Sequence, residues 1–269
     1  MENHSNQKIP MGLLPEIQKS VRAKTLAWIE PIPFQDKKFP PFLLVGLTVG
    51  STLVMKKARE KIISIVPYSL TPADLTFCHF EVLKRDSLFN FLHLSDERLM
   101  LSPGMCFPFQ TSSKSLLESR FLESKLVFQG FAKKATSFFQ SGMHLLELKD
   151  FTTAAFLFHQ AIELGLRAAE VFAIGKGTKS HRLERHILAA QSYSPALAEI
   201  FLDEHHNSIS AIAILEESYL GSRYTYSFSV SEDDLTGIPE LIKAFFNRLF
   251  QLPTSYEIAM NEFTSTHTS

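Results

Sequence analysis

The residues that could do chemistry lie mainly between positions 150 and 235 of this 269-residue chain. His159 and Glu163 are four positions apart, so a helix would place them on one face, either as a structural polar pair or as a general base with its orienting acid. A basic segment follows, which could contact phosphate groups or form a solvated face. Its members are Lys176, Lys179, His181, Arg182, Arg185 and His186.

Metal chemistry is not indicated by the spacing of the histidines and cysteines. His181 and His186 are five positions apart, and His205 and His206 are adjacent, so neither pair would place two ligands on one helical face. The chain has 2 cysteines and no C-x-x-C motif. We therefore expect no metal site and no cofactor.

A helix from Asp150 to about Gly175 should carry the polar pair. Asp150 can cap its N-terminus, and Gly175 can end it in the left-handed conformation. We expect the basic segment to be a loop. After it, the sequence predicts a short helix that starts at Pro195, a helix over residues 203–220 and a turn at residues 222–224.

Three blocks in this order resemble the HEPN domain, named for higher eukaryotes and prokaryotes nucleotide-binding. The blocks are residues 154–163 (AAFLFHQAIE), 179–183 (KSHRL) and 219–224 (YLGSRY). The resemblance implies a bundle of four or five helices, often a homodimer, that acts in nucleotide or RNA biology.

Many HEPN domains are endoribonucleases, whose motif is an arginine followed, after four to six residues, by a histidine. Arg223 matches the arginine, but the histidine positions hold Phe228, Ser229 and Val230. Without the histidine, no obvious proton-transfer group lies beside Arg223. Arg223 could bind a ligand or contact carbonyl groups at a helix end.

The composition bounds the class of protein. Hydrophobic residues make up 45% and charged residues 20%, as in ordinary globular domains. A net charge of −1 gives no overall attraction to nucleic acid, so phosphate binding must come from a local patch. The longest apolar run, residues 40–54, is too short and interrupted to span a membrane, and no signal peptide is visible. We expect a cytoplasmic protein with no membrane partner.

The N-terminal half predicts an α/β domain over residues 13–110, after a flexible tail at residues 1–12. Its alternation of helical and strand patterns favours a small mixed sheet. The expected elements are a helix over 13–28, a strand over 29–34, a strand buried on both faces over 42–49, a helix over 52–65, a strand over 74–80 and an apolar stretch over 98–109.

An α/β segment before a HEPN-like domain resembles bacterial proteins that fuse a small nucleotidyltransferase domain to HEPN. In such enzymes an Asp-x-Asp pair at the start of the second strand holds two metal ions for phosphoryl transfer. Laid on the strand at 42–49, this resemblance puts Pro40 and Phe42 at the aspartate positions, and neither can bind magnesium. The resemblance therefore implies a degenerate domain without catalysis.

The second half predicts an all-helical domain over residues 111–250, which begins with a long helix over 116–148, and a C-terminal tail at 251–269. Several phenylalanines lie on more than one side of the long helix. They are Phe121, Phe128, Phe131, Phe138 and Phe139. A helix that is apolar on two faces must bury the second one, so we expect a two-fold homodimer or packing against the α/β domain.

The expected fold class is α+β, with a small degenerate nucleotidyltransferase-like α/β domain followed by an all-α HEPN-like helical bundle. The leading interpretation is a noncatalytic protein that binds a nucleotide, RNA or a partner protein. The candidate ligand-binding residues are Arg223, Tyr224, Tyr219, His159, Glu163, Lys179, His181, Arg182 and Arg185. The alternatives are an endoribonuclease that uses Arg223 with another base such as His159, and a helical scaffold without a ligand.

Overall fold

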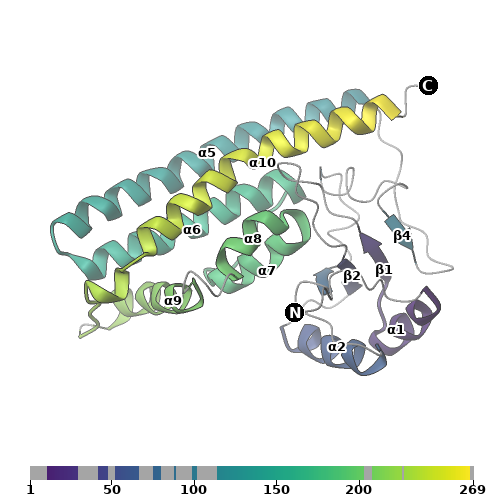
Figure 1. The fold of residues 1–269 in the computed structure, drawn as a ribbon, viewed down its shortest axis with the longest axis horizontal. Coiled ribbons are helices and arrows are strands. Elements are labelled where there is room, and N and C mark those ends of the chain that lie inside the picture. Colours follow the sequence, from purple (N-terminus) through teal and green to yellow (C-terminus); the bar gives the residue numbers. More distant parts are fainter. Residues whose placement is uncertain are drawn as a thin grey trace, which may run out of the picture. The chain divides into compact units, whose positions relative to one another are not determined.

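A computed structural model of the chain describes residues 11–29, 42–47, 52–66, 75–79, 88, 99–101, 114–202, 208–225 and 227–266 (Figure 1). The chain divides into two compact units. One comprises Met1–Glu118 with Ser255–Ser269, and the other comprises Ser119–Thr254. The predicted domain boundary near residue 110 lies outside the described residues.

The first unit combines short helices with a mixed sheet. Its elements are η1 (Met11–Leu13), α1 (Leu14–Val21), β1 (Thr25–Ile29), β2 (Phe42–Leu47), α2 (Thr52–Ile65), β3 (Leu75–His79) and β4 (Leu99–Leu101). Among the described residues the sheet has four strands in the order β3-β2-β1-β4. β1 pairs antiparallel with β2 and β4, whereas β2 and β3 are parallel. The predictions of a small mixed sheet and of a helix at 52–65 are confirmed.

β2 is the buried centre of this sheet. Leu43, Leu44 and Val45 are fully buried, although successive side chains point to opposite faces. A strand covered on both faces is apolar throughout, which is why it appears in the sequence as an uninterrupted apolar run. The prediction of a doubly buried strand is therefore confirmed.

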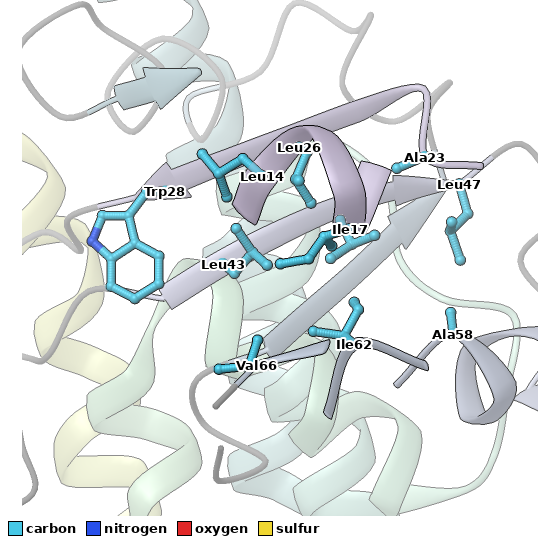
Figure 2. Close-up of a cluster of buried hydrophobic side chains, with 11 residues drawn as sticks. Leu14, Ile17, Ala23, Leu26, Trp28, Leu43, Leu47, Ala58, Ile62 and Val66 are labelled. Atoms are coloured by element: carbon cyan, nitrogen blue, oxygen red, sulfur yellow. The ribbon is translucent and has the colours of Figure 1, made fainter. Parts of the chain in front are cut away.

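α1 and α2 pack against one face of the sheet. Leu14 and Ile17 of α1 and Ile62 of α2 belong to one cluster of buried side chains with Leu26 of β1 and Leu43 of β2 (Figure 2). This cluster joins residues that lie far apart in sequence, so the helices and the sheet of this unit depend on each other for burial.

The predicted helix over 13–28 is too long. α1 ends at Val21, because Arg22 adopts the left-handed conformation with φ 53° and the chain then enters β1 at Thr25. A helix end of this kind is usually marked by glycine, and here an arginine occupies the position. The strand expected over 29–34 starts earlier than predicted, and its residues 30–34 lie outside the described part of the chain.

The second unit is a helical bundle, as predicted. It contains most of α5 (Lys114–Glu147), then α6 (Phe151–Ile174), α7 (Leu183–Tyr193), α8 (Pro195–Leu202), α9 (Ser208–Tyr224), η4 (Asp233–Leu235) and the first part of α10 (Ile238–Thr266). Figure 1 shows α5, α6 and α10 as its long helices. Ring contacts join them, with centroids 5.7 Å apart for Phe128 and Phe172 and 5.6 Å apart for Phe139 and Phe246.

α6 begins and ends at the predicted residues. The Asp150 side chain accepts a hydrogen bond from the Thr153 N–H at 3.2 Å, and Gly175 is left-handed with φ +70°. Between these ends, Gly165 lets α10 approach closely, because a Cβ at this position would lie 2.6 Å from the Phe245 ring. The helix that carries the candidate site is thus defined at both ends and packed in its middle.

Two local predictions around the basic segment are wrong. Arg185 and His186 lie in the first turn and a half of α7 rather than in a loop, and residues 222–224 form the last turn of α9 rather than a separate turn. The loop is therefore limited to residues 175–182.

The C-terminal tail predicted after residue 250 is also wrong, because α10 continues to Thr266. Leu252, Tyr256 and Ala259 are buried and follow one another at helical spacing. This buried stripe carries the helix through Pro253, whose missing N–H would otherwise favour a break.

The phenylalanines of α5 pack mainly inside the second unit. Phe121 and Phe128 are buried against Phe172 of α6, and Phe139 contacts Phe158 of α6. Three of the five phenylalanines that suggested a second apolar face therefore pack within the bundle, and Phe131 and Phe138 are half-buried.

The exposed apolar side chains of α5 are aliphatic instead. Leu122 is 61% exposed and Leu126 is 70% exposed, one helical turn apart, and Val127 lies beside them at 45%. These three residues are called the α5 aliphatic patch below, and they form an exposed apolar surface on this helix.

We predict that truncating Ile62 destabilises the first unit, whereas truncating Ile63 has little effect on its stability. Ile62 is fully buried and Ile63 is 44% exposed on the same helix. Ile62→Ala should lower the free energy of unfolding by about 2–4 kcal/mol, because it leaves a cavity, whereas Ile63→Ala should cost less than about 1 kcal/mol. Urea denaturation of both variants checks this, and equal losses would contradict the described packing of α2.

Candidate functional site

α6 provides one polar face within an otherwise apolar helix. His159, Glu163, Arg167 and Glu170 follow one another at intervals of four, four and three residues, so their side chains share a face. His159, Glu163 and Glu170 are buried there. Buried charged groups need partners, and the loop at 175–182 together with α7 provides most of them.

The Glu163 carboxylate is the first centre of this face. It is 4% exposed, and its oxygens lie 2.8 Å from Arg167 Nη2 and 3.2 Å from His181 Nδ1. The amide of Gln160 also donates to it at 3.4 Å. One buried carboxylate thus joins α6 to the loop that carries His181.

The Glu170 carboxylate is the second centre. One oxygen accepts the backbone N–H of Thr178 at 2.6 Å, and the other lies 2.8 Å from His186 Nδ1. The Ser180 carbonyl accepts from His186 Nε2 and from Arg167 Nη2, both at 2.9 Å. These four hydrogen bonds hold the loop backbone against α6 at two points.

The contacts of His186 favour its protonated form. Burial lowers the pKa of its imidazole, but the hydrogen bond and negative charge of Glu170, the hydrogen bond to the Ser180 carbonyl and the charge of Glu163 act in the opposite direction, and the pKa is raised overall. Both ring nitrogens face acceptors, so the protonated form satisfies both contacts. When His186 is protonated, it forms a fully buried ion pair with Glu170.

The contacts of His159 match a neutral imidazole with its proton on Nε2. Its Nε2–H donates to the His181 carbonyl at 3.0 Å, and its Nδ1 accepts from the Gln160 amide at 3.2 Å. Its ring is fully buried and stacks on Tyr219 at 4.6 Å. The expected polar pair with Glu163 is present at 3.9 Å, with Gln160 hydrogen-bonded to both residues. A general-base role for His159 would need an exposed nitrogen, which this geometry does not provide.

His181 is the exposed histidine of the site. Its side chain is 59% exposed, its Nδ1 faces Glu163, and its ring stacks on Tyr219 with centroids 5.1 Å apart. In the described part of the chain its Nε2 has no hydrogen-bond partner. A carboxylate behind an exposed imidazole is an arrangement that suits ligand binding or proton transfer.

Arg182 connects the loop to α9. Its guanidinium lies 3.4 Å from Glu216 of α9 and 3.0 Å from Glu184. Glu216 also accepts the backbone N–H of Glu184 at 3.0 Å, which satisfies one of the unpaired donors at the start of α7. Part of the charge of Arg182 is therefore balanced within the fold.

The structure describes the side chains of only some of the other predicted site residues. Lys179 and Arg185 are exposed, Lys179 beside His181 on the loop and Arg185 on α7. The backbone of Arg223 and Tyr224 forms the end of α9, whereas their side chains lie outside the described part of the structure. The structure thus brings His159, Glu163, His181 and Tyr219 into one cluster. It places the Arg182 guanidinium against Glu184 and Glu216 and leaves the Arg223 guanidinium unassigned.

Sequence reasoning did not identify Gln160, Arg167, Glu170 and Glu216 as parts of this site. Arg167 and Glu170 were detectable, because charged residues on the buried face of a helix require partners. Glu216 lies on another helix, and only the tertiary fold brings it to Arg182.

Within the described residues, no three His, Cys, Asp or Glu side chains gather closely enough to hold a metal ion. No helix there is long and apolar enough to cross a membrane.

The geometry defines a class of domain. It is a helical bundle whose second long helix, α6, carries buried charged groups. Residues 128–251 match the family model of the HEPN domain, and the match supports a HEPN domain over this range. It includes the three blocks at 154–163, 179–183 and 219–224. No curated protein matches the chain. The match begins after residue 110, so the nucleotidyltransferase-like interpretation of residues 13–110 remains a prediction.

We predict that the neutral amide of Glu163→Gln will destabilise the second unit. The substitution keeps the shape but removes the charge that compensates Arg167 and that faces His181 Nδ1, and both of these partners are partly exposed. The free energy of unfolding should fall by about 1–3 kcal/mol. The matched control is Glu147→Gln, because Glu147 also lies near a histidine but is 75% exposed, and it should change stability by less than about 0.5 kcal/mol. Equal effects in thermal or urea unfolding would refute a central role for Glu163.

Proposed function

We propose that the HEPN domain at residues 128–251 is a binding module for a nucleotide or RNA, with the loop at 175–182 as its contact surface. The observation that carries this proposal is that two buried carboxylates, Glu163 and Glu170, hold a loop whose outward side chains are basic. Lys179, His181 and Arg182 are all exposed on it. Lys176 of the loop and Arg185 of α7 are exposed as well.

Local charge is what such a module requires. The chain as a whole has a net charge of −1, so long-range attraction to a polyanion is weak. A group of exposed cations next to one another still attracts phosphates at short range and releases counterions when they bind. Glu163 and Glu170 are buried, whereas Glu184 and Glu216 pair with Arg182, so Lys179 and His181 carry the exposed basic groups of the loop together with part of the Arg182 charge.

Preorganisation favours binding at this loop. Residues 178 and 180 are fixed by hydrogen bonds to Glu170, His186 and Arg167. A loop that is ordered before the ligand arrives loses less conformational entropy on binding. The exposed His181 ring, supported by Tyr219, also offers a flat face on which a nucleobase could stack.

We predict that Lys179→Ala will weaken binding of a fluorescein-labelled single-stranded RNA of mixed sequence by about threefold to tenfold at low salt, because one phosphate contact is lost. The slope of log affinity against log salt should fall by about 0.7. Fluorescence anisotropy measures both quantities. The control is Lys134→Ala on α5, an exposed lysine outside the loop, which should bind like the unaltered chain. Equal affinities for the two variants would rule out the loop as the contact surface.

An endoribonuclease is the second candidate function, and the exposure of His181 is the observation that favours it. With Glu163 at Nδ1, its Nε2 is suited to take a proton from a ribose 2′-hydroxyl. Metal-independent cleavage of the same RNA, lost in both His181→Ala and Arg223→Ala, would establish this activity. If the RNA stays intact after prolonged incubation with the unaltered chain, the endoribonuclease is ruled out and the noncatalytic binding module remains.

We further predict a homodimer that pairs through the α5 aliphatic patch, which would remove exposed leucine side chains from water. Leu126→Glu should convert the dimer to a monomer, because it places a charge at the centre of the contact. Multi-angle light scattering at micromolar concentration measures the mass. Lys134→Glu is the matched control on the same helix and should stay dimeric. A monomeric mass for the unaltered chain would refute this assembly.

A further inference from the structure

The pair formed by His186 and Glu170 has a geometry that depends on one proton. His186 Nδ1 lies 2.8 Å from a Glu170 oxygen, and Nε2 lies 2.9 Å from the Ser180 carbonyl. A carboxylate and a carbonyl only accept hydrogen bonds, so both ring nitrogens must donate. A neutral imidazole has one N–H and can satisfy only one of these two partners.

Both partners are attached to the same loop. Ser180 belongs to it directly, and Glu170 accepts the backbone N–H of Thr178 through its other oxygen. His186 itself is fixed in α7, and Glu170 is fixed in α6. Loss of the proton therefore weakens the contact between the loop and the two helices on either side of it.

We propose that the His186–Glu170 pair is a proton-dependent latch, which holds the loop at 175–182 against α6 when protonated and releases it when the proton is lost. The state of the latch determines how firmly the loop holds the exposed side chains of Lys179, His181 and Arg182 in place. It is a property of the fold itself and does not require that the loop bind RNA.

The charged groups around His186 favour the closed state. From α6 it faces Glu170 and the charge of Glu163, and the Arg167 guanidinium shares the Ser180 carbonyl with it. On α7 its neighbours Glu184 and Arg185 are exposed and opposite in sign. The pKa of His186 is raised above its ordinary value. The stabilisation is therefore fully present below the ordinary histidine pKa and is lost as the pH rises through the raised pKa.

The latch can be tested without any ligand by amide hydrogen exchange measured by NMR. The Thr178 N–H, which donates to Glu170, is the reporter. In the unaltered chain its protection factor, corrected for intrinsic exchange, should fall about tenfold or more between about pH 6 and about pH 9, as one hydrogen bond of the loop is lost. Amides in the middle of α6 should keep their protection and serve as the internal reference.

Glu170→Gln is the decisive variant. Its amide can donate to a neutral His186 Nδ1 and still accept the Thr178 N–H, while His186 Nε2–H donates to Ser180, so every contact survives without the extra proton. The Thr178 protection should then be the same at both pH values. A purely structural role for Glu170 predicts reduced protection at both pH values instead, and that result would overturn the latch.

The matched control is His144→Gln, since His144 lies 3.9 Å from Glu147 on α5 and is 69% exposed. This variant should show the same pH dependence as the unaltered chain. If Glu170→Gln does not fold, the ring ¹⁵N shifts of His186 in the unaltered chain decide the matter. A titration midpoint of these shifts above the ordinary histidine pKa supports the latch, and a midpoint at or below it refutes the latch. Failure of RNA binding would leave these results unchanged.

Discussion

Burial of two carboxylates on one face of α6 constrains the path of the chain that follows this helix. An ionised carboxylate inside a protein is strongly destabilising unless it is paired and hydrogen-bonded. For Glu163 and Glu170 the pairing groups include Arg167, His181 and His186. Two of these three lie after Gly175, so the chain must reverse there and return along α6. The left-handed glycine makes the reversal possible, and the carboxylates determine where it leads.

The same constraint explains how a nearly neutral chain can present a positive surface. Glu163 and Glu170 bind the inner groups of the loop, and Glu216 of α9 binds one side of Arg182. The acidic partners thus lie beneath or beside the loop, where they orient it. An anionic ligand approaching from the solvent would meet the remaining cationic groups first. Charges that cancel in the composition are separated in space by the fold.

The sequence predicted the elements whose signals are local. The caps of α6 at Asp150 and Gly175, the apolar run of β2 and the pair of His159 and Glu163 were all detectable within a few residues. The predictions that were wrong failed because the structure there depends on contacts that are distant in sequence or on a backbone conformation that residue type does not indicate. α1 ends at an arginine in the left-handed conformation, which propensity does not mark. α10 continues through Pro253 because buried side chains on the far side of the proline compensate for the lost hydrogen bond. The site was predicted in part, since its histidines were visible but their carboxylate partners on α6 and α9 needed the tertiary fold.

The two histidines of the site show how burial separates structural from chemical roles. His181 and His186 each place Nδ1 against a buried glutamate, and the two pairs start from similar chemistry. His186 has its second nitrogen on a backbone carbonyl and no access to solvent, so a change in its protonation can only be relieved by moving the loop. His181 has its second nitrogen exposed, so it can exchange a proton or a hydrogen bond with a ligand while the backbone stays in place. The His186 pair therefore ties the loop to α6, whereas the His181 pair leaves a ring nitrogen exposed.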